Sequence, residues 1–211
     1  MPVSPRDLLS RNRDWAEARR GQDPQFFERL SEQQAPRYFW VGCSDSRVPA
    51  TQIVDIDPGE IFVHRNVANL CAHTDLNFLA SLQFAVEVLR VEHVIVCGHY
   101  ACGGVRAALG ERSSGLVDHW IRSLRDLREH HRAILDGAID RSEAADLLTE
   151  LNVRTQVDNI AHNPIVQAAW RRGQKIEIHG WVYRVHDGIL HDLDYRRSDH
   201  ATVNDSHRIS S

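Results

Sequence analysis

The stretch "FWVGCSDSRVPA", Phe39 to Ala50, carries a cysteine, an aspartate and an arginine at every second position, directly after residues typical of a buried strand. Side chains in an extended segment alternate between two sides, so Cys43, Asp45 and Arg47 should point the same way. The pattern therefore predicts that a thiol, a carboxylate and a guanidinium share one small site at the end of a strand.

A second segment with polar chemistry is "CGHYACGG", Cys97 to Gly104, which follows the apolar run "HVIVC". That run is typical of a strand buried on both faces, and the two glycines after Cys102 indicate a turn into a helix. Open α/β sheets place ligand sites beyond the carboxyl ends of their strands. We therefore expect His99 and Cys102 to meet Cys43 in space.

Strands and helices alternate along the chain and predict an α/β fold: a mainly parallel β-sheet flanked by helices, with an N-terminal helical arm. We expect strands within 37–42, 60–69, 93–99, 175–185 and 189–194. We expect helices within 74–90, 116–135 and 142–172, with Thr74 as an N-cap and a break at Pro164.

The 211 residues suit a single domain, 1–211, made of a helical arm (1–35), an α/β core that holds the metal site (36–195) and a C-terminal tail (196–211). The arm reads as two helices with scattered apolar residues and too little apolar surface for a core of its own. We expect it to pack on another surface, such as a second subunit.

The formal net charge is −4, so the sequence does not indicate a positively charged surface that would bind nucleic acid or an anionic membrane. No apolar run reaches the length of a membrane span, and the first residues lack the apolar core of a secretory signal. We expect a cytoplasmic protein with neither nucleic-acid nor membrane partners, whose cysteines do not form disulfides.

Two thiolates and one imidazole around a tetrahedral ion are a zinc ligand set. Three protein ligands, Cys43, His99 and Cys102, leave the fourth position open for water or substrate, which predicts one Zn²⁺ per subunit. The helix that follows Cys102 should favour its thiolate. Cys97, within the buried strand, and Cys71, in a loop, are expected to be structural.

The motifs "CSDSRVP" and "HYACGG", with "PGEIFVHRNVAN" between them, resemble those of the β-class carbonic anhydrases, from about Gln34 to about Asp194. The resemblance implies a zinc lyase, a carbonate dehydratase, that converts carbon dioxide and water to bicarbonate and a proton and assembles as a homodimer or as a homotetramer, a dimer of dimers. The site residues that it implies are zinc ligands Cys43, His99 and Cys102, a catalytic pair Asp45 and Arg47, and substrate-binding Gln34 and Gly103.

The chemistry of these residues agrees with that assignment. Asp45 can accept a hydrogen bond from zinc-bound hydroxide while Arg47 holds the carboxylate in a bidentate pair. If Asp45 leaves Arg47, it can itself become a metal ligand, so we expect a closed, inactive site at neutral and acidic pH that opens as pH rises. Two thiolates and a neutral imidazole leave zinc with roughly zero net charge, which predicts an alkaline activity profile.

Some bacterial members of the family are inhibited by bicarbonate at a non-catalytic site, and the matching positions here are Trp40, Arg65 and Tyr183. An indole N–H, a guanidinium and a phenol offer an anion donors from several directions. The alternative is ordinary packing of two aromatic rings, with Arg65 bound to backbone carbonyls or to a carboxylate.

Two other functions are compatible with these residues. The first is a structural zinc site with four ligands, Cys43, Asp45, His99 and Cys102, which leaves Arg47 without a purpose. The second is a hydrolase of the same fold that acts on carbon disulfide or carbonyl sulfide, which no residue specifically supports. A carbon dioxide hydration assay beside a sulfide-release assay separates all three.

Overall fold

The computed structural model describes residues 3–32, 34–110 and 115–209 and divides into two compact units, Met1–Ala35 and Pro36–Ser211. The first unit holds two helices, α1 (Pro5–Gln22) and α2 (Phe26–Glu32). A capping box between Ser4 and Asp7 begins α1, and no residue of α1 is buried. The prediction of two N-terminal helices without a core of their own is confirmed.

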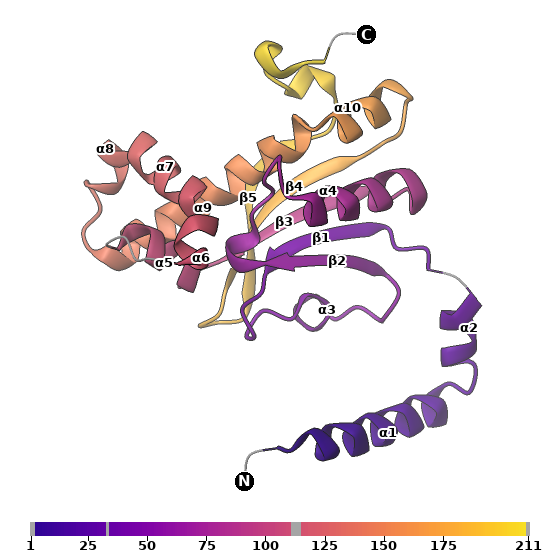
Figure 1. Ribbon diagram of the computed structural model, residues 1–211. Helices are drawn as coiled ribbons and strands as arrows, with labels where there is room; N and C mark the ends of the chain where they lie inside the picture. The colour runs from indigo at the N-terminus through magenta and orange to yellow at the C-terminus, as the bar shows by residue number, and fades with distance from the viewer. Residues whose placement is uncertain (1–2, 33, 111–114, 210–211) are drawn as a thin grey trace. The chain divides into compact units, whose positions relative to one another are not determined.

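A five-stranded sheet forms the centre of the second unit (Figure 1). Its strands are β1 (Tyr38–Cys43), β2 (Ile61–Asn66), β3 (His93–His99), β4 (Glu177–Arg184) and β5 (Ile189–Arg197). They lie in the order β2-β1-β3-β4-β5, and only the pair β4–β5 is antiparallel. The predicted mainly parallel sheet is therefore confirmed.

The helices and turns of the second unit connect and cover these strands. The helices are α3 (Ala50–Ile53), α4 (Leu76–Gln83), α5 (Gly103–Leu109), α6 (Leu116–Trp120), α7 (Arg122–His130), α8 (Arg132–Leu135), α9 (Arg141–Ala161) and α10 (Pro164–Arg171). A π turn (Phe84–Val88) extends α4, and 3-10 turns lie at Val67–Asn69, His200–Thr202 and Asp205–His207. Each of these helices in the described part of the chain is too short or too polar to cross a membrane.

The structure confirms some of the predicted helix boundaries and corrects others. The break at Pro164 is confirmed, because Asn163 caps α10 by accepting the N–H of Ile165. The expected N-cap at Thr74 is wrong: α4 begins one residue later, and Asp75 accepts the N–H of Asn77. The segment 116–135 is helical as predicted but bends at Ile121 and His131, so it forms three short helices.

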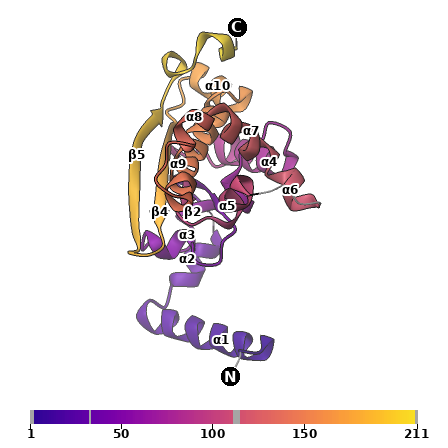
Figure 2. The same cartoon turned by 90° about the vertical axis from the view of Figure 1, so that its left-hand side faces the viewer.

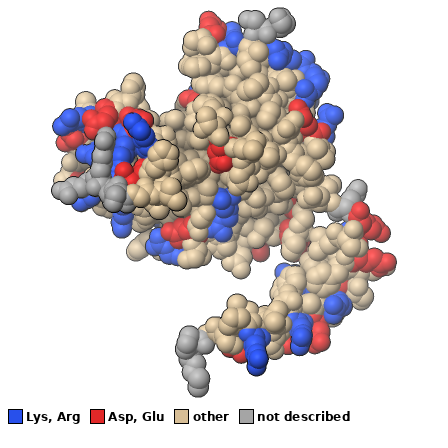
Figure 3. All heavy atoms as spheres, in the orientation of Figure 1, with Lys and Arg blue, Asp and Glu red and all other residues tan. Residues whose placement is uncertain are grey.

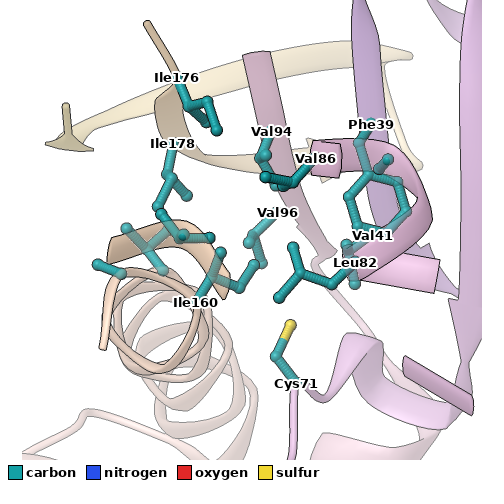
Figure 4. Packing of buried hydrophobic residues seen from close by; sticks show 14 of the residues in the cluster. Phe39, Val41, Cys71, Leu82, Val86, Val94, Val96, Ile160, Ile176 and Ile178 are labelled. Atoms are coloured by element: carbon teal, nitrogen blue, oxygen red, sulfur yellow. The ribbon is translucent and has the colours of Figure 1, made fainter. Parts of the chain in front are cut away.

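One face of the sheet is covered by α4, α9 and α10, and Figure 2 shows α9 and α10 on one side of β4 and β5. Figure 4 shows the packing between the layers: Val94 and Val96 of β3 point toward Leu82, Val86 and Ile160 on the helices. On β3, the side chains of Val94, Val96 and Cys97 are wholly buried, as expected of a strand covered on both faces.

The opposite face carries an aromatic cluster that includes Trp40, Tyr183 and Trp181, together with residues of α3. A third cluster, built from α5, α7 and α9, lies beyond the carboxyl ends of β1 and β3 and contains Cys43 and Cys102. On the side shown in Figure 3, the surface of α7 and α8 mixes both signs of charge, and Arg132 lies 3.2 Å from Asp136.

Candidate metal centre and active site

The carboxyl ends of two neighbouring strands bring three ligand-type side chains together. Cys43 is the last residue of β1, His99 is the last residue of β3, and Cys102 directly precedes α5. Their sulfur and nitrogen atoms all lie within 4.8 Å of one another, and all three residues are buried. The chain leaves β1 for β2 on one side and then crosses to β3 on the other, which is the kind of switch point where α/β sheets bind ligands.

The hydrogen bonds of His99 determine which ring nitrogen is available. Its Nδ1 lies 3.1 Å from the carbonyl oxygen of Tyr100, and a carbonyl only accepts, so Nδ1 carries the proton. Its Nε2 therefore presents a lone pair, and it is one of the buried side-chain atoms of the described residues without a hydrogen-bond partner. Burying an unpaired acceptor costs free energy unless another group binds it. A metal ion would be such a group, so Nε2 is suited to be a metal ligand.

The two cysteines form a pair that shares a proton. Their sulfur atoms are 3.9 Å apart, and the hydrogen bond between them lowers the pKa of Cys43 despite its burial. The same contact raises the pKa of Cys102, although the N–H groups of Val105 and Gly104 at the start of α5 act in the opposite direction. The N–H groups at the start of α5 thus act on Cys102 in the expected direction, but the contact with Cys43 and burial outweigh them.

The turn Val67–Asn69 supports this pair, and the expectation that a strand continues to residue 69 is wrong, because β2 ends at Asn66. Ala68 and Asn69 both adopt positive φ, at 67° and 48°, which costs roughly 1–3 kcal/mol for a residue other than glycine. This turn aims the N–H of Ala68 at Cys43, where it helps to lower the pKa of the thiol. A Cβ added at Gly104 would lie 3.0 Å from the Cβ of Ala68, so Gly104 permits α5 to approach the turn closely.

Buried amides of α9 hold the turn in place. Asn152 donates to the carbonyl of Ala68 at 3.0 Å, and Gln156 accepts the N–H of Cys71 at 2.8 Å. Gln156 also donates to Asn152 at 2.9 Å, so the two amides form one network. Two amides four residues apart on the face of α9 that carries its apolar residues were the available sequence signal, because buried amides must find partners.

Asp45 and Arg47 form the predicted bidentate pair, but the predicted extended segment is wrong: β1 ends at Cys43, and the pair lies in a turn in which Val48 donates its N–H to the carbonyl of Asp45 at 3.1 Å. Arg47 donates from Nε and Nη2 to the two carboxylate oxygens at 2.9 and 2.7 Å, and its backbone N–H adds a third bond of 3.0 Å. The Arg47 guanidinium is the main cause that holds the pKa of Asp45 well below its usual range. Oδ2 of Asp45 lies 3.7 Å from Nε2 of His99, so the carboxylate borders the group of three donors.

The side chain of Arg65 binds the backbone of the segment that contains Cys43 and Asp45. It donates from Nε to the carbonyl of Cys43 at 2.8 Å and from Nη2 to the carbonyl of Asp45 at 2.6 Å. Trp40 and Tyr183 belong to one buried cluster, and a Cβ at Gly42 would lie 2.5 Å from the indole nitrogen of Trp40. Gly42 is also the register partner of Arg65, so Trp40 and Arg65 lie on the same face of the sheet, next to this glycine.

The two predicted substrate-binding residues occupy different units. Gly103 is exposed and begins α5 directly after Cys102. Gln34 is exposed and lies in the first unit. Cys97 and Cys71 are fully buried, and burial is the main cause that raises the pKa of both thiols, in keeping with the packing roles expected for them.

A mainly parallel sheet with two cysteines and a histidine at adjacent strand ends defines an α/β protein with a metal-binding type of active site. A sequence model of the carbonic anhydrase family matches residues 38–190. A carbonic anhydrase of Emericella nidulans is 41% identical over 187 residues, covering 89% of this chain and 82% of that protein. One of Candida albicans is 35% identical over 191 residues, covering 89% and 67%.

Solved structures agree with the sequence comparison. A β-carbonic anhydrase of Coccomyxa, in complex with acetazolamide, superposes with a TM-score of 0.89 and 40% identity, over 94% of this chain and 89% of that one. A tetrameric β-carbonic anhydrase of Sordaria macrospora gives 0.86 and 38%, over 90% and 96%. The chain therefore belongs to the β-class carbonic anhydrases and is a carbonate dehydratase, a lyase.

Proposed function

We propose that this chain hydrates carbon dioxide with one zinc ion per subunit, held by Cys43, His99 and Cys102. The observation that carries the proposal is the unpartnered Nε2 of His99, whose lone pair lies with the two cysteine sulfurs inside 4.8 Å. Two cysteines and a histidine suit zinc and leave one position open. When bound, zinc supplies a Lewis acid that lowers the pKa of a coordinated water molecule.

Among the residues of this chain, Asp45 has the acid–base role. Its carboxylate stays ionised because of Arg47, so Oδ2 can accept a hydrogen bond from a water molecule beside His99. Arg47 fixes the direction of that oxygen. We further propose that a closed form exists, in which Asp45 leaves Arg47 and becomes a fourth metal ligand, so that exchange of this one ion pair opens and closes the site.

Substrate contacts are proposed for Gly103 and Gln34. Gly103 supports this role by its place beside Cys102, where a Cβ would meet no atom within 4 Å, so the backbone is accessible. Gln34 rests on the family resemblance, and a helical arm without a core of its own fits a homodimer or a dimer of dimers. The domain limits, the cytoplasmic location and the lack of nucleic-acid or membrane partners stay predictions from the sequence.

A regulatory bicarbonate site is proposed at Trp40, Arg65 and Tyr183. The support is that Arg65 holds the carbonyls of Cys43 and Asp45, which directly couples an anion bound at its guanidinium to the catalytic segment. An anion that draws Arg65 away would loosen the segment and favour the closed form, which gives the difference in affinity that an allosteric inhibitor needs. The same two hydrogen bonds also satisfy the alternative, that Arg65 only stabilises the backbone.

Zinc content and carbon dioxide hydration, measured together, test the central proposal. We expect the purified chain to hold one zinc ion and to lose activity when a chelator removes it. Cys43→Ala should lack both zinc and activity, whereas Cys71→Ala, which removes another buried thiol, should keep both. Full activity of metal-free protein, or of Cys43→Ala, would refute zinc-dependent hydration.

A further inference from the structure

A second group of ligand-type side chains lies at the opposite end of the sheet from the candidate active site. It consists of His93, the first residue of β3, with Glu177 and His179 on β4. We propose that these three residues bind a second divalent transition-metal ion. The site is separate from carbon dioxide hydration, because β3 runs roughly 20 Å from His93 to His99 at the usual rise of a parallel strand.

The register of the sheet places the three side chains on one face. Glu177 and His179 are two residues apart on β4, so they point the same way. His93 is the register partner of Glu177 in the parallel pair β3–β4, and side chains at paired positions share a face. The grouping is therefore built into the backbone rather than into flexible surface side chains.

The three donor atoms already have the spacing that a metal ion needs. Nδ1 of His93 lies 3.1 Å from Nε2 of His179, and Oε2 of Glu177 lies 3.9 and 3.5 Å from these two atoms. A triangle with these sides has a circumscribed circle with a radius of about 2.1 Å. Zinc binds imidazole nitrogen at about 2.0–2.1 Å and carboxylate oxygen at about 2.0–2.2 Å, so an ion near the centre of the triangle reaches all three donors.

The surroundings favour neutral imidazoles and a cation. His179 is buried, and burial lowers its pKa despite the nearby Glu177 carboxylate. The charge of Arg196, its register partner on β5, is offset by Asp192 at 2.7 Å. Tyr38 stacks on His93 with the ring centroids 5.5 Å apart, which fixes the plane of that imidazole.

A pocket of about 610 Å³ gives access to the group. His93 and Glu177 line it, together with Asp199, which adds negative charge, and Lys175, which opposes it. Glu92 also lines the pocket, but its charge is paired with Arg37 at 2.5 Å. Two histidines and one glutamate leave a coordination position open for water from this pocket, and imidazole-rich sites suit zinc, nickel and copper. The alternative is a plain hydrogen bond in which one imidazole donates to the other.

Zinc titration of the tag-free, zinc-loaded enzyme tests the proposal by calorimetry and by metal analysis after dialysis. We expect a second equivalent of zinc per chain, weaker at pH 5.5, where the imidazoles must lose protons to bind. His93→Gln and Glu177→Gln should each lower this second affinity by more than tenfold, with the first equivalent unchanged. The control His130→Gln removes an exposed histidine at the end of α7 and should keep both equivalents.

Cobalt spectroscopy gives a second measurement that needs no variant. Co²⁺ added to the zinc-loaded enzyme should produce visible d–d bands without thiolate charge-transfer bands, because the proposed ligands contain no sulfur. The proposal is overturned if no second equivalent binds, if both glutamine variants retain it, if His130→Gln loses it, or if the added cobalt shows thiolate bands.

Discussion

Oδ2 of Asp45 lies 3.7 Å from Nε2 of His99, so a carboxylate held by an arginine on the loop after β1 meets an unpartnered imidazole nitrogen at the end of β3. Among the described residues, only Arg47 makes hydrogen bonds to the side chain of Asp45, and its guanidinium binds both carboxylate oxygens. The direction of the carboxylate toward His99 therefore depends on the fork geometry of one guanidinium.

Arg47→Lys tests this dependence, because lysine keeps the charge but loses the fork. We expect carbon dioxide hydration to fall by roughly 10–100-fold, the usual cost of losing a partner that orients an active site, with zinc content unchanged. Stopped-flow assays and metal analysis of the same preparations measure both. Arg122→Lys, an exposed arginine on α7, is the control, and equal activity of Arg47→Lys and the parent would contradict the role of the pair.

Trp40→Phe and Tyr183→Phe test the bicarbonate site. Each keeps the aromatic ring but removes a donor, so both should weaken inhibition by bicarbonate while zinc content stays the same. The measurement is the initial rate against bicarbonate concentration at constant pH and ionic strength. Trp15→Phe, in the first unit, serves as the control. If both variants are inhibited as strongly as the parent, Arg65 serves only to hold the backbone of Cys43 and Asp45.

Gly104→Ala tests the support of Cys43 by the turn Val67–Asn69. The added Cβ would lie 3.0 Å from the Cβ of Ala68 and 3.1 Å from Cγ1 of Val67, so the turn must shift. We expect a loss of about 1–3 kcal/mol in the free energy of unfolding, typical of overpacking, and weaker zinc binding in a chelator competition. Gly103→Ala meets no atom within 4 Å and should preserve stability and zinc affinity. Equal behaviour of the two variants would show that the close approach is unimportant.

His162→Gln tests a contribution of histidine burial to the pH dependence of stability. Burial and the stacked ring of His207, 4.2 Å away between centroids, lower the pKa of His162, against the pull of Asp158. As pH falls through about 6.5, the unfolded chain gains a proton that the folded chain still excludes, so stability is lost. Thermal unfolding at pH 7.5 and 5.5 should show a smaller drop for His162→Gln than for the parent. Identical drops would exclude this contribution.

The sequence alone determined the sheet and the identity of the donor set. Apolar runs before Cys43 and His99 predicted two buried parallel strands, and a spacing of two predicted that Asp45 and Arg47 pair. The strands follow from local periodicity and from the rule that strands of one α/β sheet end at the same edge, whereas Asp45 and Arg47 pair through a turn after β1 and not through strand alternation. The N-cap of α4 was misplaced by one residue because Thr74 and Asp75 are both good caps, and only the path of the backbone selects between them.

The tertiary structure decided the tautomer and the hydrogen-bond partners of the donor residues. It also brought together the second group of ligand-type side chains. The tautomer of His99 depends on one carbonyl, and the N–H that Ala68 directs at Cys43 depends on a turn held by Asn152, which lies 84 positions after Ala68 in the sequence. His93 lies 86 positions before His179, and no local pattern joins them until β3 and β4 pair in register. Such contacts arise from strand order and register, which set distances between residues far apart in the chain, whereas sequence periodicity describes only near neighbours.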